Sequence, residues 1–522
     1  MRRRREFKNQ LLAGEVSPDY YEASNDELAA TALKQQRNAI GINAGGSVRR
    51  PGTYMISDIT VDKRFEQLDL DTGGYVIAAF YDGYVDILDP DDGSVIDTVA
   101  GPWSTSSVKT MQVANGENLM WIYSNDFHPQ VLRHDGGGSY SVGDETFSGG
   151  TGGSISQPYY RYAARGISLT PGATSGTGIS LVFSEDFLTD DHIGTRIRYV
   201  DNEIEVKTVT DAQNGTGDVI SALYPTLRVT VASVAPFKVD HRVNGTITGV
   251  SGVVIAVGAG TVDVVLISGY SHFDATSPEK LRSPNGESAI SAVTTISPGE
   301  TVLWDEQMIS DARGYPGAVC KHRNRKFIGG FPDAPSAIVM SAAGFPDDYD
   351  LGDGDVADAS IELLGDNENA QIRHIVSAEQ LIIGTDRACY YVPESEQAPI
   401  VPGGVEFKKI SPDSMSEVPP LVVPEGVVFT DNADRLLILS PTGNVRASWV
   451  VGELSNLSDH LLTDPVELAY LPGLGTRRER FLLVRNDDGT IVVFSYRRNS
   501  DQLGAALWSV YGDGRFGYIC AV

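Results

Sequence analysis

Short β-favouring segments separated by tight-turn residues dominate this sequence, and they favour a fold of many short strands. The clearest example is the stretch GGYVIAAFYDGYVDILDPDDGSVIDTVA. Asp82-Gly83 between two apolar runs predicts a hairpin with strands Tyr75–Tyr81 and Tyr84–Leu88. The turn Asp89–Gly93 then leads into a third strand over Ser94–Val99.

Similar units return later in the chain. Predicted turns at Gly384–Asp386, Asn432–Asp434 and Asp487–Gly489 each lie between two apolar strands. The spacing of the units is irregular, roughly 40–50 residues, which is typical of propeller blades rather than of a strict short solenoid. We therefore predict a mainly β fold with a β-propeller-like body.

Two other regions differ from this pattern. Residues of about 175–300 contain short Val/Ile/Thr strands with glycine turns, which predict small β-barrel or sandwich modules inserted into the body. The Gly/Ser/Thr-rich stretches Ser148–Gly153 and Pro171–Gly178 are interpreted as hinges into this insertion. Near the N-terminus, Ser24–Ile40 has a modest helical face behind possible N-caps, which predicts a short helical arm.

The chain is therefore expected to have four parts. Residues 1–54 form an arm and helix used in assembly, 55–170 a first propeller-like β part, 171–300 the inserted small β modules, and 301–522 a second propeller-like part that completes the body.

Composition limits the partners of the chain. It has 41 basic against 69 acidic residues, a formal charge of −28, which argues against nonspecific adhesion to nucleic acid and suits a surface that repels DNA. Three cysteines without a CxxC pair make a zinc site or a disulfide framework unexpected. The sequence has no run of about 18 apolar residues and no secretory signal, so we expect a soluble protein made in the cytoplasm.

No catalytic, cofactor or metal residues are predicted. The acidic run DDYDLGDGDVADASIE lacks the ligand spacing of a calcium loop and is interpreted as an acidic loop. HExxH, GxSxG and P-loop motifs are absent, and the GxGxxG match at Gly512–Gly517 has too few residues after it for a helix. Asp311 and Arg313 could be catalytic, but an ion-paired turn is favoured. Sheet packing is expected for the tryptophans Trp103, Trp121, Trp304, Trp449 and Trp508.

The stretch AGGSVRRPGTYM raises a separate question. It places Arg49 and Arg50 between a glycine pair and a Pro-Gly turn in an otherwise acidic protein. Three interpretations are open: a contact with a phosphate, an ion pair with a neighbouring chain, or an exposed solvated turn.

Four segments resemble a known family, the tail nozzle proteins of short-tailed phages, of the tail tubular protein B type. Members open with a G-E-x-S-P stretch, here Gly14–Pro18, followed by a glycine-rich turn and R-R-P-G-T, here Arg49–Thr53. The segments Asp311–Ser341 and Ile372–Thr385 resemble two further family motifs. Members often continue beyond a W-S-V-Y stretch, here Trp508–Tyr511, so a C-terminal tip module is absent from this sequence or supplied by another protein.

The resemblance implies a structural, non-enzymatic protein of the virion tail. Such proteins form a six-fold homo-oligomeric ring below the head–tail adaptor, contact tail fibre or spike proteins, and act as a conduit through which double-stranded DNA passes without specific binding. In this setting we expect Arg49 and Arg50 to form ion pairs with a neighbouring subunit or the adaptor. The expected assembly residues are Glu15, Pro18, Arg49, Arg50, Pro51 and Gly52.

Two other functions remain open at this point. In the first, the inserted modules make the chain a receptor- or glycan-binding tail component that contacts the host cell surface. In the second, the propeller is a glycan hydrolase, although no carboxylate pair can be located among the 69 acidic residues.

Overall fold

The structure is a computed structural model of the 522-residue chain, and the chain divides into two compact units. It describes residues 11–521 apart from 12, 23–30, 43–45, 53–60, 150–152, 268–271, 276–277, 297, 353, 366–369, 396–398, 445–446, 474–479, 497–503 and 512–513. The first unit comprises Met1–Glu145, Tyr315–Pro346 and Leu351–Val522, and the second comprises Thr146–Gly314 and Asp347–Asp350.

The described residues of the first unit form five four-stranded antiparallel sheets, one six-stranded sheet and a small hairpin. In chain order, the first two four-stranded sheets are β5 Arg64–Asp69, β6 Tyr75–Tyr81, β7 Tyr84–Leu88 and β8 Val95–Ala100, and β9 Gln112–Asn115, β10 Leu119–Ser124, β11 Phe127–Gly136 and β12 Ser139–Asp144. The next two are β26 Ala318–His322, β27 Arg325–Gly329, β28 Ala337–Met340 and β29 Ser360–Leu363, and β30 Ile372–Ser377, β31 Leu381–Thr385, β32 Cys389–Val392 and β33 Lys408–Ser411. The fifth consists of β34 Leu421–Val423, β35 Gly426–Thr430, β36 Leu436–Asn444 and β37 Ala447–Glu453. The six-stranded sheet, here called the last sheet, has the order β2 Ala32–Leu33, β1 Gly14–Glu15, β41 Gly504–Trp508, β40 Ile491–Tyr496, β39 Arg480–Asn486 and β38 Pro465–Leu471, and the hairpin is β3 Ala39–Gly41 with β4 Ser47–Arg49.

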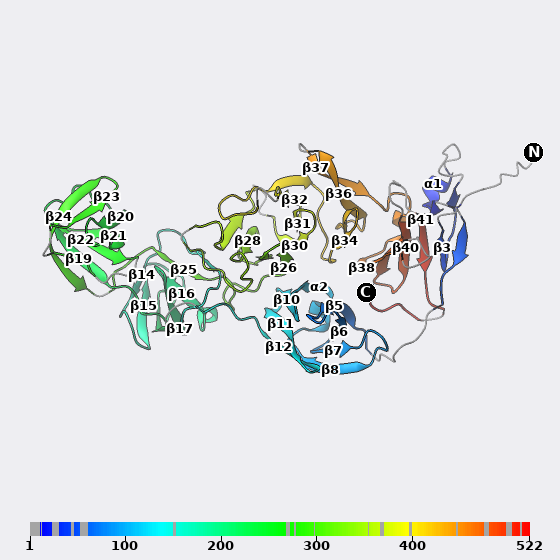
Figure 1. The fold of residues 1–522 in the computed structure, drawn as a ribbon, viewed down its shortest axis with the longest axis horizontal. Helices are drawn as coiled ribbons and strands as arrows, with labels where there is room; N and C mark the ends of the chain where they lie inside the picture. The colour runs from blue at the N-terminus through cyan, green and yellow to red at the C-terminus, as the bar shows by residue number, and fades with distance from the viewer. Residues whose placement is uncertain are drawn as a thin grey trace, which may run out of the picture. The chain divides into compact units, whose positions relative to one another are not determined.

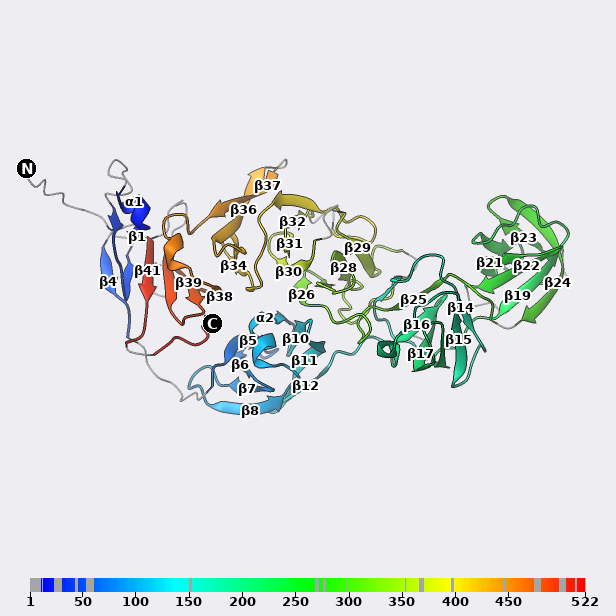
Figure 2. The same ribbon diagram turned by 180° about the vertical axis from the view of Figure 1, so that it is seen from behind.

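These six sheets follow one another around a common centre, which is the arrangement of a β-propeller (Figures 1 and 2). One cavity of about 310 Å³ is lined by residues of β5, β9, β26 and β30, and another of about 400 Å³ by residues of β5, β34 and β38. One edge strand of each of these six sheets therefore faces the centre. The predicted mainly β, propeller-like body is confirmed.

The local hairpin predictions are confirmed for the first sheet, the one formed by β5–β8. Strands β6 and β7 have the predicted limits, and β8 begins one residue after the predicted Ser94. The core between this sheet and the next is apolar and includes Phe80, Trp103 and Phe127, all buried. The rings of Phe80 and Trp103 meet edge to face with centroids 5.2 Å apart, a favourable aromatic geometry.

Helices are short in the described part of the chain. They are α1 Pro18–Glu22, α2 Thr105–Thr110, and the 3₁₀ turns η2 Asp190–His192 and η3 Asp459–Leu461. None of the helices among the described residues has the length and apolarity to cross a membrane.

A short N-terminal helix is described, but it precedes the Ser24–Ile40 pattern that predicted it. The helix is α1, whereas Ala32–Leu33 and Ala39–Gly41 are strands, and residues 23–30 lie outside the described residues. The apolar residues Ala32 and Ile40 pack against Leu457 and Phe481 of the body, respectively. Pairing with the last sheet therefore overrides the weak helical preference of this segment.

The second unit contains a seven-stranded sheet and a closed six-stranded barrel, which agrees with the predicted small β modules. The sheet has the order β13 Tyr159–Tyr160, β25 Trp304–Gln307, β16 Arg196–Tyr199, β17 Asn202–Val209, β18 Asn214–Val219, β15 Ile179–Phe183 and β14 Leu169–Pro171. The barrel has the order β19 Thr226–Val231, β22 Thr261–Leu266, β21 Ser251–Val257, β20 Arg242–Gly245, β23 Lys280–Ser283 and β24 Gly286–Ile296.

This unit extends beyond the expected residues 171–300 because β13, β14 and β25 belong to its sheet. The interpretation of Pro171–Gly178 as a hinge into the insertion is wrong. That segment joins β14 to β15, which pair with each other inside the second unit. The glycines there serve a hairpin turn instead.

A buried carboxylate holds two loops of the barrel. Glu279 Oε1 accepts hydrogen bonds from the Thr248 backbone N–H at 2.7 Å and from its hydroxyl at 2.6 Å, and Oε2 accepts from the Asp274 N–H. Burial opposes ionisation of Glu279, but these donors and the Ile247 N–H outweigh it and lower its pKa.

Glu279→Gln is expected to destabilise the barrel by about 1.5–3 kcal/mol at pH 7, because an amide cannot accept all of these bonds. Since the folded pKa is lowered, this stabilisation is present above the unfolded value of about 4.5 and is lost as the pH falls through the folded pKa. Hydrogen exchange of barrel amides should therefore separate the variant from the wild type at pH 7 and much less at pH 3. An equal difference at both pH values would contradict this assignment.

Candidate functional site

The G-E-x-S-P motif docks the N-terminal arm onto the last sheet. Gly14 has a φ of +63° and pairs in parallel with Ala505 of β41. A Cβ at Gly14 would lie 2.4 Å from the Ala505 carbonyl oxygen. Only glycine combines this left-handed conformation with so close an approach.

Glu15 is buried and makes its contacts inside the chain. Its Oε2 accepts a hydrogen bond from the Gln36 N–H at 2.7 Å and pairs with the Arg37 guanidinium, and its Oε1 lies 3.5 Å from His460 Nε2. The Ser458 hydroxyl donates to the Glu15 carbonyl at 2.7 Å. The structure therefore places Glu15 at the base of the arm, where it ties β1 to the loop after β37.

The two arginines of R-R-P-G-T have different surroundings. Arg50 Nε donates to Asn38 Oδ1 at 3.0 Å, and its guanidinium lies 5.8 Å from the Trp508 ring centroid and 5.7 Å from that of Phe516. Cation–π contact of this kind fixes Arg50 on the last sheet. Arg49, at the end of β4, is exposed.

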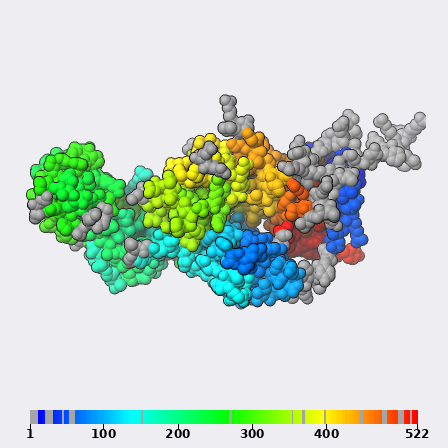
Figure 3. All heavy atoms as spheres, viewed as in Figure 1, coloured from blue at the N-terminus to red at the C-terminus, as the bar shows by residue number. Residues whose placement is uncertain are grey.

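The other predicted assembly residues lie at the surface. Pro18 is exposed at the first position of α1, and Pro51 and Gly52 are exposed after β4. Figure 3 shows the blue atoms of this arm against the red atoms of the chain's C-terminal part. The structure thus collects the six predicted residues on one docked arm, four of them exposed.

Carboxylates of the acidic run DDYDLGDGDVADASIE accept hydrogen bonds from backbone N–H groups of the same run. Asp358 Oδ2 accepts from the backbone N–H groups of Gly354 at 3.0 Å and Asp355 at 2.8 Å, and Asp348 Oδ1 accepts from the Asp350 N–H at 3.0 Å. No group of three metal-ligating side chains occurs among the described residues.

Arg313 lies in an ion pair, as the favoured interpretation predicted. Its Nε and Nη2 each donate to Glu306 at 2.9 Å, and its guanidinium lies 4.7 Å from the Tyr162 ring centroid. Glu306 Oε2 is also 3.4 Å from His192 Nε2. Sequence spacing gave no sign of this cluster because His192 comes from a segment far from Glu306 and Arg313.

Thr189, His192 and Glu306 resemble the hydroxyl, imidazole and carboxylate of a catalytic triad, but the imidazole accepts a hydrogen bond from the backbone. His192 Nδ1 accepts from the Thr189 N–H at 3.1 Å and lies 2.9 Å from the Thr189 hydroxyl, an arrangement that caps η2. A nucleophile needs a base that is free to take its proton, whereas this nitrogen already accepts a backbone hydrogen bond.

A carboxyl group holds the C-terminal segment, residues 514–521, against β38. Glu467 Oε2 accepts from the Ile519 N–H at 2.7 Å and from Arg485 Nε at 3.2 Å. Burial raises the pKa of Glu467 to about 7 despite these donors. Between pH 4.5 and 7 the native carboxyl therefore holds a proton that the unfolded chain has released, so this group lowers stability as the pH rises through that window.

Glu467→Gln is expected to remove this pH dependence. The unfolding free energy of the variant minus that of the wild type should rise by about 2–3 kcal/mol between pH 4.5 and 8, whatever its starting value. Urea unfolding of both proteins across this range measures the difference, from which all other titrations cancel. Parallel profiles would contradict the raised pKa.

The comparisons with known proteins add little to this geometry. No family model matches the chain, and no curated protein matches it. Among solved structures, Hsv2 of Kluyveromyces lactis aligns with 85% of this chain and 97% of its own at 6% identity and a TM-score of 0.28. AztD of Citrobacter koseri aligns with 86% and 96% at 10% identity and a TM-score of 0.29. Scores this low carry no argument about function, and the fold assignment rests on the sheet topology itself.

Proposed function

We propose that this chain is a structural virion protein, a tail nozzle of a short-tailed phage that forms the distal part of the tail tube. The observation that carries the proposal is the position of the G-E-x-S-P and R-R-P-G-T motifs. Both lie on one arm that is anchored by Gly14, Glu15 and Arg50 and leaves Arg49 exposed. An arm with a fixed base and an exposed edge is suited to bridge neighbouring subunits.

A ring of subunits explains this division between anchored and exposed residues. In cyclic symmetry one face of each subunit meets a different face of the next, so the arm binds a surface that is not its own copy. Arg49, as an exposed cation on a chain of charge −28, is matched to an acidic surface of the neighbour or the adaptor. The same negative charge disfavours adhesion of passing DNA to the conduit.

The test is charge reversal at the exposed arginine. Arg49→Glu is expected to reduce incorporation of the chain into phage particles at least tenfold while its melting temperature stays unchanged. Arg165→Glu, the same change at an exposed residue of the second unit, is the control and should assemble normally. Normal incorporation of Arg49→Glu would overturn the proposed role of the arm, and a chain absent from purified tails would overturn the nozzle function.

A further inference from the structure

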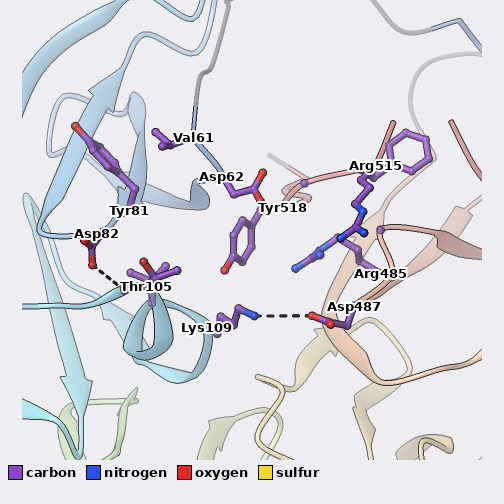
Figure 4. A pocket seen from close by; sticks show the side chains of 14 residues that line it. Val61, Asp62, Tyr81, Asp82, Thr105, Lys109, Arg485, Asp487, Arg515 and Tyr518 are labelled. Carbon is purple, nitrogen blue, oxygen red and sulfur yellow. Dashed lines mark hydrogen bonds and ion pairs between the residues drawn. The ribbon is translucent and has the colours of Figure 1, made fainter. Parts of the chain in front are cut away.

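A cavity of about 510 Å³ lies in the first unit between the first and last sheets. Figure 4 shows its walls: the turn after β6 with Asp82, helix α2 with Lys109, the turn after β39 with Asp487, and the C-terminal segment with Arg515. These residues are far apart in sequence, so the cavity is formed only when the propeller closes. It marks the seam between the first and last sheets.

Three cationic side chains from three different elements line this cavity. Arg485 is almost entirely buried, with 9% of its side chain exposed, and its Nε is bound to Glu467 while the end of its guanidinium lies in the cavity (Figure 4). Arg515 also points into the cavity and makes no ion pair within the described part of the chain. Lys109 Nζ is 3.8 Å from Asp487 Oδ1, the length of a loose pair between partly exposed groups.

Three aspartates also line the cavity, and within the described part of the chain none of them forms an ion pair with Arg485 or Arg515, although Arg485 is paired with Glu467. Asp82 Oδ1 accepts the Thr105 N–H at the start of α2 at 3.0 Å, and Asp487 faces Lys109. Asp62 also lines the cavity and lies beside Tyr518 (Figure 4). An anion in the cavity can therefore pair with the Arg515 guanidinium and with the end of the Arg485 guanidinium that does not contact Glu467.

We propose that this seam cavity binds a small ligand carrying a phosphate group. Guanidinium groups present paired N–H donors that match phosphate oxygens, and the lysine adds a third positive charge from another direction. Tyr518 also lines the cavity, and its ring centroid lies 4.8 Å from the Arg485 guanidinium. Its hydroxyl can donate a further hydrogen bond to a phosphate oxygen. A bound phosphate would contact α2, β39 and the C-terminal segment, and would thereby hold the first and last sheets together.

The test is the thermal unfolding of the full chain in sodium phosphate and in sodium chloride at equal ionic strength. Phosphate is expected to raise the melting temperature saturably, by about 2 °C or more, because it binds only the folded state. Arg515→Gln should abolish the rise, and the matched control Arg165→Gln should keep it. Since Arg515 is exposed, its variant is expected to fold.

The phosphate could come from a small ligand or from a DNA backbone. Thermal unfolding is therefore repeated with a short DNA duplex at the same phosphate concentration. A response to inorganic phosphate that Arg515→Gln removes supports a small-ligand site whether or not the duplex also responds. Overturning results are equal shifts in phosphate and chloride, a phosphate shift that persists in Arg515→Gln, or a response to the duplex alone.

Discussion

Lys326→Ala is expected to destabilise the first unit by about 3–5 kcal/mol, among the largest effects of any single substitution in this chain. Both Lys326 and Glu145 are fully buried and form an ion pair. The Tyr123 hydroxyl donates to the same carboxylate, and the Lys326 ammonium lies 4.9 Å from the Trp121 ring centroid. Removing the lysine leaves a fully buried carboxylate without its cation, which is the main cost.

Urea unfolding measures this loss, and two controls separate charge from packing. Lys321→Ala, an exposed lysine on the neighbouring strand β26, should change stability by less than about 0.5 kcal/mol. Replacing both partners with Lys326→Met and Glu145→Gln should recover part of the loss, because no unpaired charge remains. A loss below 1 kcal/mol in Lys326→Ala would contradict the buried pair.

Gly14→Ala is expected to detach the N-terminal arm at a cost of about 2–3 kcal/mol. The added Cβ would meet the Ala505 backbone oxygen at 2.4 Å and nitrogen at 2.5 Å, and the φ of +63° disfavours any residue with a side chain. The undocked population should therefore rise roughly 30- to 150-fold. Limited proteolysis of the arm measures this population directly.

The same substitution elsewhere in the arm is the matched control. A Cβ at Gly52 meets nothing within 4 Å, so Gly52→Ala should leave the rate of arm cleavage unchanged. Equal cleavage rates for the two alanine variants would show that the arm does not depend on the close approach at Gly14.

Local hairpins were predictable from the sequence because their signals are local. Asp82-Gly83 fixes the limits of β6 and β7 through turn chemistry, with Gly83 at a φ of +73°. The arm was less predictable, because Ala32 becomes a strand residue by pairing with Gly14 of β1, and Ile40 by pairing with Val48 of β4 where β3 lies against β41 and β40. That preference depends on the closed propeller, which no window of sequence contains.

The sites illustrate the same limit. The motif Gly14–Pro18 could be found from sequence, but whether Glu15 faces a neighbour or its own body depends on Arg37 and His460, which are 22 and 445 residues away. The seam cavity draws on residues from Val61 to Tyr518, and no periodicity joins them. The fold class follows from patterns of short range, whereas the sites depend on contacts of long range.

Cryo-electron microscopy of the phage tail tests the nozzle function most directly. A nozzle is expected to form a ring of this chain on the tail axis below the adaptor, with Arg49 of each subunit against a neighbouring chain and Glu15 enclosed within its own. A chain located only on fibres or spikes away from the axis would contradict the nozzle function and favour the receptor-binding alternative.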